Sequence, residues 1–379
     1  MLTRPRRTPW PALMAVVALF LIALPAAAQK GGDYKYNDAH FHLTNYIQEG
    51  TPLADYVKIM GTTVKRSTVF GIPLQQMWDY NNSGDFAPTY YLQSDAPLYY
   101  YSFTDAFIAM SYRALPADQQ ARLDPMITGF NPVDMYAADH IRRVLLTFPG
   151  VFSGIGEFTI HKEFVSSKIA GGTASLKNAA LDRILEFSGE AGLVVILHSD
   201  IDMPFPKPDQ EPYLVMQMKE LIERHPGTMV IWAHAGLGRV VRPVNDQIAI
   251  FERGLANPAL ANLYIDISWD ETAKYITATP EGLKRTADLI NKYPDRFLFG
   301  TDVVAPRSID SPMAVYNAYD PLWKLLTPET RQKVLLTNYE RLFDAARVKV
   351  RAWEKANVGK PAPVPAPTPV SGYKTTGEK

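Results

Sequence analysis

Residues 193–198 read Leu-Val-Val-Ile-Leu-His, and residues 229–234 read Met-Val-Ile-Trp-Ala-His. Each stretch is a continuous apolar run that ends in a histidine, without the alternation of a strand that faces water on one side. Such runs are typical of parallel strands covered by helices on both faces. The amphipathic segment between them, residues 213–224, predicts the helix that connects two parallel strands.

The same strand-then-helix unit repeats along the chain. Eight strands are predicted, at residues 36–42, 67–72, 125–131, 152–160, 193–198, 229–234, 263–269 and 297–302. Helices are predicted at residues 135–147, 175–191, 213–224, 245–255, 281–293 and 312–326. The last four strand ends, at residues 198, 234, 269 and 302, are 36, 35 and 33 residues apart, which suits one strand, one helix and two loops. We therefore expect an α/β fold, a (β/α)₈ TIM-like barrel. An open doubly wound sheet is less favoured, because no Gly-rich phosphate loop follows the first strand.

A long interval after the second strand interrupts this repeat. Within it, residues 78–103 hold 9 aromatic residues in 26 positions, against 11% in the whole chain. Long loops in compact domains are often functional. This aromatic-rich insertion predicts either a lid over the substrate or a set of rings that packs on the barrel rim or on a neighbouring subunit.

The N-terminus carries the pattern of an export signal. Three arginines in residues 4–7 precede an apolar run at residues 12–24, and Ala26-Ala27-Ala28 fits a small-residue cleavage site. Residues 1–28 therefore predict a signal peptide and a mature chain that starts at Gln29. The apolar run is shorter than the roughly 20 residues that span a bilayer. We expect a bacterial protein that is periplasmic or secreted, with no stable membrane insertion after cleavage.

The predicted barrel occupies residues 34–357, and residues 358–379 form a separate tail. Alternating prolines in that tail predict an extended, disordered segment. Because the chain has 39 basic and 39 acidic residues, it lacks the basic footprint of a nucleic-acid-binding protein. It also has no cysteine, so any metal must be bound by histidines and carboxylates. The expected partner is a small-molecule substrate, and a homo-oligomer is compatible with the sequence.

Histidines and carboxylates occupy the predicted strand ends. His40 and His42 end the first strand, and because residues i and i+2 of a strand face the same side, both side chains point the same way. Glu157 lies in the fourth strand, and the remaining three residues end the fifth, sixth and eighth strands: His198, His234 and Asp302. A closed barrel brings the C-terminal ends of its strands onto one ring. The pattern predicts a metal site there.

This constellation resembles the amidohydrolase superfamily, specifically its amidohydrolase-related, decarboxylase-like branch. The resemblance covers residues 36–344 and depends on the complete set in this order: His40-x-His42, Glu157, His198, His234 and Asp302. It implies a distorted barrel with one or two divalent ions, often zinc, and either hydrolysis or non-oxidative decarboxylation. Carried over, His40, His42, His198 and Asp302 bind metal, and His234 is catalytic or binds a second ion.

Glu157 stands where other branches of the superfamily have a carboxylated lysine. It can bridge two metal ions, bind one ion or bind the substrate. Asp302 is the predicted general base, because a carboxylate beside an activated water can take its proton and return it to the leaving group. His234 can orient the water or polarise the substrate carbonyl. Three further residues are candidates for substrate binding: His161, Trp269 and Arg307.

We therefore expect a secreted metal-dependent hydrolase that uses an activated water on an ester, lactone or amide. A metal-dependent decarboxylase of an aromatic or unsaturated carboxylic acid is the first alternative. A non-catalytic protein that binds a metal or ligand is the second.

Overall fold

The computed structural model describes residues 34–45, 49–72, 103–162, 175–202 and 212–360, together with the backbone of five short strands between these ranges. These strands are β4 (Met77–Trp78), β5 (Leu92–Gln93), β8 (Val165–Ser166), β9 (Lys168–Ile169) and β10 (Gly172–Thr173). The predicted signal peptide, nearly all of the aromatic-rich segment at residues 78–103 and the tail beyond residue 360 lie outside the described residues.

Eight parallel strands form the central sheet, and they follow one another in chain order. They are β1 (Tyr36–Asp38), β3 (Val64–Val69), β6 (Leu123–Ile127), β7 (Gly154–Lys162), β11 (Val194–Ser199), β12 (Val230–Trp232), β13 (Leu263–Asp266) and β14 (Phe297–Leu298). Each overlaps one predicted strand. Their side chains are almost all buried, as continuous apolar runs require when both faces of a parallel sheet are covered.

The last strand returns to the first, which closes the sheet into a barrel. The Ala39 amide donates to the Phe299 carbonyl at 3.1 Å, and the Asp302 amide donates to the His40 carbonyl at 2.7 Å. Beyond these bonds, β2 (Phe41–His42) pairs in parallel with β15 (Val303–Val304). The predicted α/β barrel is confirmed, and the open-sheet alternative is wrong because an open sheet would leave both edge strands without these bonds.

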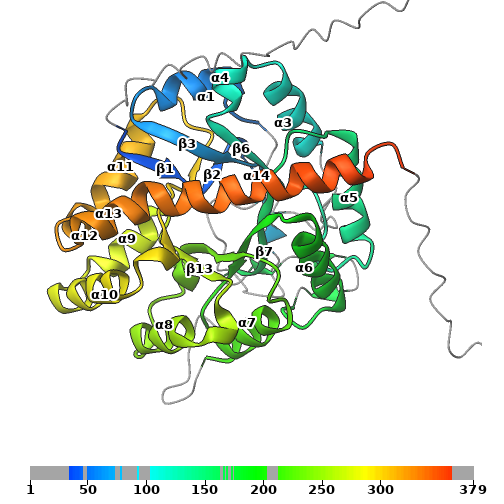
Figure 1. Cartoon of the computed structure of the whole chain (residues 1–379). Helices are drawn as coiled ribbons and strands as arrows, with labels where there is room; N and C mark the ends of the chain where they lie inside the picture. The colour runs from blue at the N-terminus through cyan, green and yellow to red at the C-terminus, as the bar shows by residue number, and fades with distance from the viewer. Residues whose placement is uncertain are drawn as a thin grey trace, which may run out of the picture. The chain divides into compact units, whose positions relative to one another are not determined.

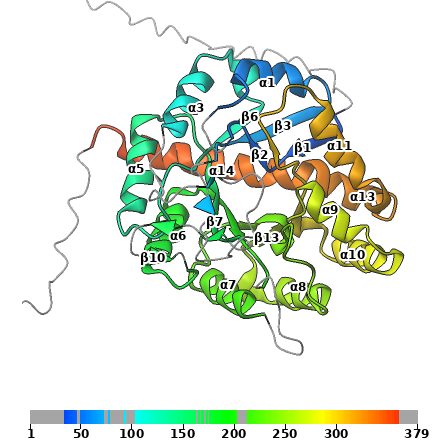
Figure 2. The ribbon, with the colours of Figure 1, turned by 180° about the vertical axis from the view of Figure 1, so that it is seen from behind.

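Helices surround the strands (Figures 1 and 2). They are α1 (Leu53–Met60), α3 (Thr104–Arg113), α4 (Ala117–Gln120), α5 (Ala137–Thr147), α6 (Ala179–Ala191), α7 (Tyr213–Arg224), α8 (Gln247–Ala256), α9 (Asp270–Ile276), α10 (Pro280–Lys292), α11 (Asp310–Ala318), α12 (Asp320–Trp323), α13 (Pro328–Gln332) and α14 (Asn338–Asn357). The helix predicted at residues 312–326 is two helices, α11 and α12. Pro321 at the start of α12 explains the break, because proline cannot continue a helix interior.

The long helix α14 closes the N-terminal end of the barrel. It crosses in front of the strands in Figure 1. Its buried side chains Tyr339, Leu342, Phe343 and Ala346 join one apolar cluster with the strand residues that fill the barrel interior. The Tyr339 hydroxyl donates to Asp124, near the start of β6, at 2.8 Å. The open end of the barrel is therefore the opposite one, where the strands have their C-termini.

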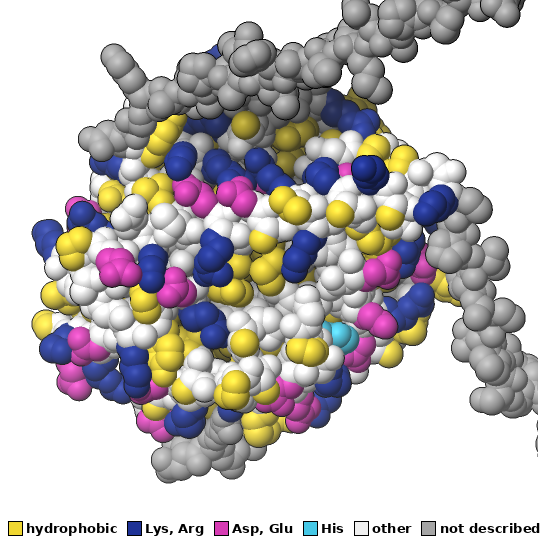
Figure 3. All heavy atoms as spheres, in the orientation of Figure 1, with side chains coloured by type: hydrophobic (Ala, Val, Ile, Leu, Met, Phe, Trp, Pro, Cys, Tyr) yellow, Lys and Arg dark blue, Asp and Glu magenta, His cyan; other side chains and the backbone are white. Residues whose placement is uncertain are grey.

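Basic and acidic side chains are interspersed on the face shown in Figure 3, which agrees with the balanced composition. Among the described residues, no helix combines the length and the apolar character needed to cross a membrane.

Candidate metal centre

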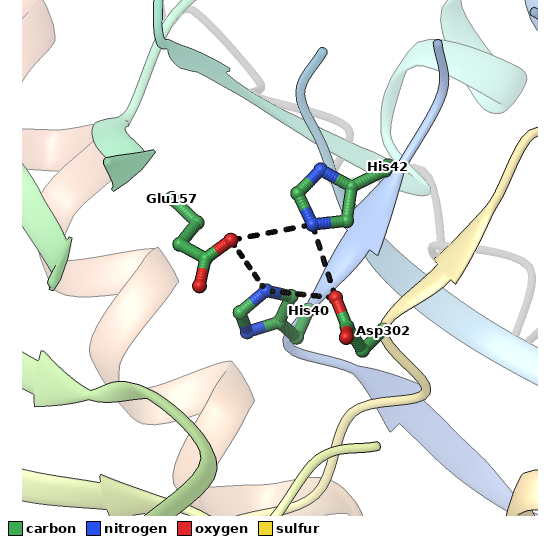
Figure 4. A group of neighbouring side chains, drawn as sticks. All are labelled: His40, His42, Glu157 and Asp302. Atoms are coloured by element: carbon green, nitrogen blue, oxygen red, sulfur yellow. Dashed lines mark ion pairs between the residues drawn. The ribbon is translucent and has the colours of Figure 1, made fainter. Parts of the chain in front are cut away.

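Three buried side chains, those of His40, His42 and Glu157, meet the half-buried side chain of Asp302 at the C-terminal end of the barrel (Figure 4). The His42 Nε2 atom lies 3.0 Å from Asp302 Oδ1, and His40 Nε2 lies 3.3 Å from the same oxygen. Glu157 Oε2 completes the group at 3.5 Å from His42 Nε2 and 3.6 Å from His40 Nε2. Two imidazole nitrogens and two carboxylate oxygens thus converge on one point.

A second group shares Glu157 with the first. The other carboxylate oxygen of Glu157, Oε1, lies 2.5 Å from His198 Nδ1 and 3.2 Å from His234 Nε2. Within each group, the possible ligand atoms lie within 4.8 Å of one another. The structure therefore brings together all six residues predicted for the centre, and it places the Glu157 carboxylate between two pairs of histidines.

Two outer side chains orient the histidines. The His40 Nδ1 atom lies 2.6 Å from Asp266 Oδ2, and His234 Nδ1 lies 2.8 Å from Ser268 Oγ. A histidine that donates from Nδ1 to a carboxylate presents Nε2 as a free electron pair, which is the arrangement around protein-bound metals. Sequence reasoning did not assign these roles to Asp266 and Ser268. Their one signal is position, since Asp266 ends β13 and Ser268 follows two residues later.

The backbone turns sharply where the functional side chains project. His234 and Asp302 have φ angles of 55° and 54°, in the left-handed region that residues with a Cβ seldom adopt. For this reason β12 ends at Trp232, and His234 lies in the short helix η1 (Ala233–Gly236) instead of ending the strand as predicted. Asp302 likewise lies between β14 and β15. Such strained positions concentrate at functional sites.

The electrostatics of the cluster suit a cation. Burial alone would raise the pKa of Asp302, but the neighbouring His234 and His42 outweigh it and hold that pKa below its usual value. Burial would also raise the pKa of Glu157, and Lys162 and His198 hold it well below the usual range. Both lowered pKa values favour the ionised carboxylates at neutral pH.

The His40 Nε2 atom, which faces these two carboxylates, is buried and has no hydrogen-bond partner in the described part of the chain. A buried ring nitrogen without a hydrogen bond is costly unless it binds a ligand. Imidazole nitrogens with carboxylate oxygens form a donor set that zinc accepts. The residues present therefore fit a divalent metal ion.

The three residues predicted to bind substrate lie in different places. The Trp269 ring is 5.0 Å from the His234 ring, at the edge of the centre. His161 lies on β7, and its buried Nε2 atom has no hydrogen-bond partner among the described residues. Arg307 is exposed and lines a groove of about 620 Å³ with Thr51 and Lys58. Substrate binding by all three stays a prediction.

The family model described as amidohydrolase matches residues 38–345 of the chain. None of the curated proteins matches it. Many solved structures resemble it, and three of them follow. A putative 2-pyrone-4,6-dicarboxylic acid hydrolase from Pseudomonas putida is 15% identical, with a TM-score of 0.48 over 82% of this chain and 98% of that one. An amidohydrolase from Burkholderia multivorans with bound zinc is 13% identical, with a TM-score of 0.48 over 82% and 98%.

The third solved structure is a 2,6-dihydroxybenzoate decarboxylase in complex with 2,6-dihydroxybenzoate. It is 15% identical to this chain, with a TM-score of 0.42 over 76% of this chain and 87% of that one. The family match covers the barrel from β1 into α14, including every residue of the candidate metal centre. The chain therefore belongs to the amidohydrolase family.

Proposed function

We propose that this chain is a secreted metal-dependent hydrolase of an ester, lactone or amide. The observation that carries the proposal is the position of Glu157, whose two oxygens face two separate pairs of histidines. A carboxylate placed in this way can bridge two divalent ions. The proposed ligands are His40, His42 and Asp302 for one zinc ion, and His198 and His234 for the other.

Metal ions in such a site supply a water molecule that ionises near neutral pH. Asp302 is the proposed base for that water, because its lowered pKa favours the ionised carboxylate and because its side chain is 10% exposed, against 4% for Glu157. Glu157 is less suited to proton transfer, since both of its oxygens face imidazole nitrogens. Asp302 takes the proton from the water and returns it to the leaving oxygen or nitrogen, so the base is restored at the end of each cycle.

His234 is proposed to bind the second ion or, in a centre with one ion, to orient the substrate carbonyl through Nε2. Its Nδ1 atom is held by Ser268 at 2.8 Å, and its ring contacts Trp269, so its direction is fixed from two sides. Burial lowers the pKa of His234.

The test compares metal-free and metal-loaded protein on a panel of esters, lactones, amides and unsaturated or aromatic carboxylic acids. Hydrolysis that disappears with chelation and returns with zinc supports the proposal. The His42→Ala variant should lose metal and activity together. His225→Ala is the matched control, because His225 pairs with Asp182 at a helix end outside the centre. Release of carbon dioxide would favour the decarboxylase instead, and full metal loading without turnover would favour a binding protein.

Export is proposed from the N-terminal sequence, which has the charged, apolar and small-residue segments of a signal peptide in the right order. N-terminal sequencing of the protein from its native envelope should give a chain that starts at Gln29. A chain that keeps residues before Ala26 would contradict cleavage.

A further inference from the structure

His198 faces the proposed metal centre with a different ring nitrogen from its neighbours. Its Nδ1 atom lies 2.5 Å from Glu157 Oε1, whereas His234 approaches the same oxygen with Nε2, at 3.2 Å. His40 likewise presents Nε2 to the Glu157 carboxylate, at 3.6 Å. The ring of His198 is therefore turned the other way round, and its Nε2 atom is left for another partner.

That partner is Asp200, a buried carboxylate two residues further along the chain. Asp200 Oδ1 lies 3.3 Å from His198 Nε2, and the residue is only 2% exposed. A neutral imidazole carries one proton, and the nitrogen without the proton offers an electron pair. Because a carboxylate accepts hydrogen bonds, Asp200 favours the form of His198 in which Nε2 holds the proton. The electron pair then lies at Nδ1, on the side of Glu157.

The backbone at Asp200 is bonded to the elements on both sides of it. Asp200 follows β11 directly, and its amide donates to the His161 carbonyl of β7 at 3.0 Å. The next amide, that of Ile201, donates to the Gly236 carbonyl at the end of η1, at 2.7 Å. These bonds fix the starting point of the Asp200 side chain, so its carboxylate can define the direction of the His198 ring, as outer partners of metal-binding histidines do.

We infer that Asp200 is a positioning residue, which fixes the His198 ring so that Nδ1 binds the second ion. A half-turn of the ring about its Cβ–Cγ bond would exchange Nδ1 with a carbon atom, which cannot bind a metal. The hydrogen bond to Asp200 opposes this turn, because Nε2 would leave the carboxylate. The inference rests on the two-ion centre of the proposed function and does not depend on which bond is hydrolysed. Asp266 has the corresponding place beside His40, so each ion has its own outer carboxylate.

Zinc titration of the metal-free protein by calorimetry tests this role without turnover. Asp200→Leu keeps a branched side chain that accepts no hydrogen bond. It should weaken one of the two binding steps by about 10–100-fold, as loss of an outer partner typically does, and leave the other step unchanged. Asp200→Asn should weaken the same step less, because its amide oxygen still accepts the Nε2 proton. Asp182→Leu is the matched control, since Asp182 faces His225 Nε2 at 2.7 Å outside the centre.

Equal losses in the Leu and Asn variants, or losses in both binding steps, would overturn the inference, because they indicate a charge effect or a general disturbance of the fold. If Asp200→Leu does not fold, the second ion must still bind measurably more weakly to Asp200→Asn than to the wild type.

NMR of isotope-labelled histidines in the zinc-loaded protein gives a readout that a merely structural role would not move. The His198 proton should lie on Nε2 in the wild type, and a proton on Nδ1 would overturn the inference. Binding and turnover fail separately here. Two zinc ions and an effect of Asp200 on one of them, in a protein that hydrolyses no ester, lactone or amide, would refute the proposed function and leave the role of Asp200 standing.

Discussion

His40 and Asp302 are joined twice, once through the backbone and once through their side chains. The Asp302 amide donates to the His40 carbonyl at 2.7 Å, and His40 Nε2 lies 3.3 Å from Asp302 Oδ1. The first bond closes the barrel between its first and last strands, and the second contact is part of the candidate metal centre. The same two residues therefore close the barrel and contribute to the candidate site. A substitution that disturbs this junction between the first and last strands, the barrel seam, should weaken metal binding.

Gly300 tests this coupling. A Cβ atom at this position would lie 2.6 Å from both the backbone nitrogen and the Cβ of His40. Gly300→Ala should therefore destabilise the fold by about 1–3 kcal/mol and weaken zinc binding, because the seam must open to admit the methyl group. Denaturant unfolding and zinc titration measure both effects.

The control for this substitution is Gly254→Ala on α8. There the nearest atom to a new Cβ is Leu260 Cδ1 at 3.9 Å, which is ordinary contact. This variant should gain about 0.5–1 kcal/mol, since alanine is favoured over glycine inside a helix. Equal stability and equal zinc affinity in the two variants would show that the contact between Gly300 and His40 affects neither folding nor metal binding.

Asp302→Asn should lower kcat by about 10²–10⁴-fold, because asparagine cannot accept the proton of the attacking water. Zinc content must be measured in the same sample, since Asp302 is also a proposed ligand. Asp270→Asn provides the control, with a carboxylate that is 51% exposed and pairs with Lys274. A variant at position 302 that keeps more than a tenth of the wild-type kcat would remove Asp302 from the role of base.

Asp266 should act on the metal through His40. Asp266→Asn replaces the carboxylate that lies 2.6 Å from His40 Nδ1, and loss of such an outer partner typically costs about 10–100-fold in metal affinity. The zinc dissociation constant, measured by competition with a chelator, should rise accordingly. Asp288→Asn, on the exposed face of α10, should leave it unchanged. An unaltered constant in Asp266→Asn would mean that His40 is oriented without this bond.

The cluster of candidate ligands could be predicted from the sequence because each of its residues ends or lies within a predicted strand. His198 and His234, for example, are the polar residues at which an apolar run of the sequence ends. The outer partners were not predictable, because the atoms that face His40 and His234 depend on the register of β13 and on the turn after it.

The sequence reading also missed α14, although its pattern is present. The buried residues Tyr339, Leu342, Phe343 and Ala346 recur at helical spacing. The rest of the helix is strongly charged, because a helix that covers the end of a barrel buries only a narrow stripe. The turn at Asp302 was unexpected for a different reason: a non-glycine residue gives no local signal for a left-handed φ.

Asp105 should make stability depend on pH. Its buried carboxylate accepts hydrogen bonds from the Thr128 and Gly129 amides at 2.9 and 2.8 Å, but burial outweighs them and raises its pKa from 3.8 to about 6. The folded state holds the proton of Asp105 more tightly than the unfolded state does. The contribution of this proton to the free energy of unfolding is therefore complete below pH 3.8 and is lost as pH rises through about 6.

The free energy of unfolding should fall by about 3 kcal/mol over this range, because the pKa of Asp105 differs by about two units between the folded and unfolded states. Asp105→Asn removes the titrating group. The unfolding free energy of wild type minus that of the variant should therefore be larger near pH 4 than near pH 7. A difference that does not change with pH would contradict the raised pKa.

Counting the metal ions bound by the apo-protein tests the central claim most directly. The protein is stripped with a chelator, titrated with zinc by calorimetry, and its metal content is then measured. Two ions per chain should bind, Glu157→Gln should lower that number, and His225→Ala should not. A wild-type chain that takes up no stoichiometric zinc, or that binds it equally well with Glu157 and His42 both replaced by alanine, would contradict the metal centre and the hydrolase built on it.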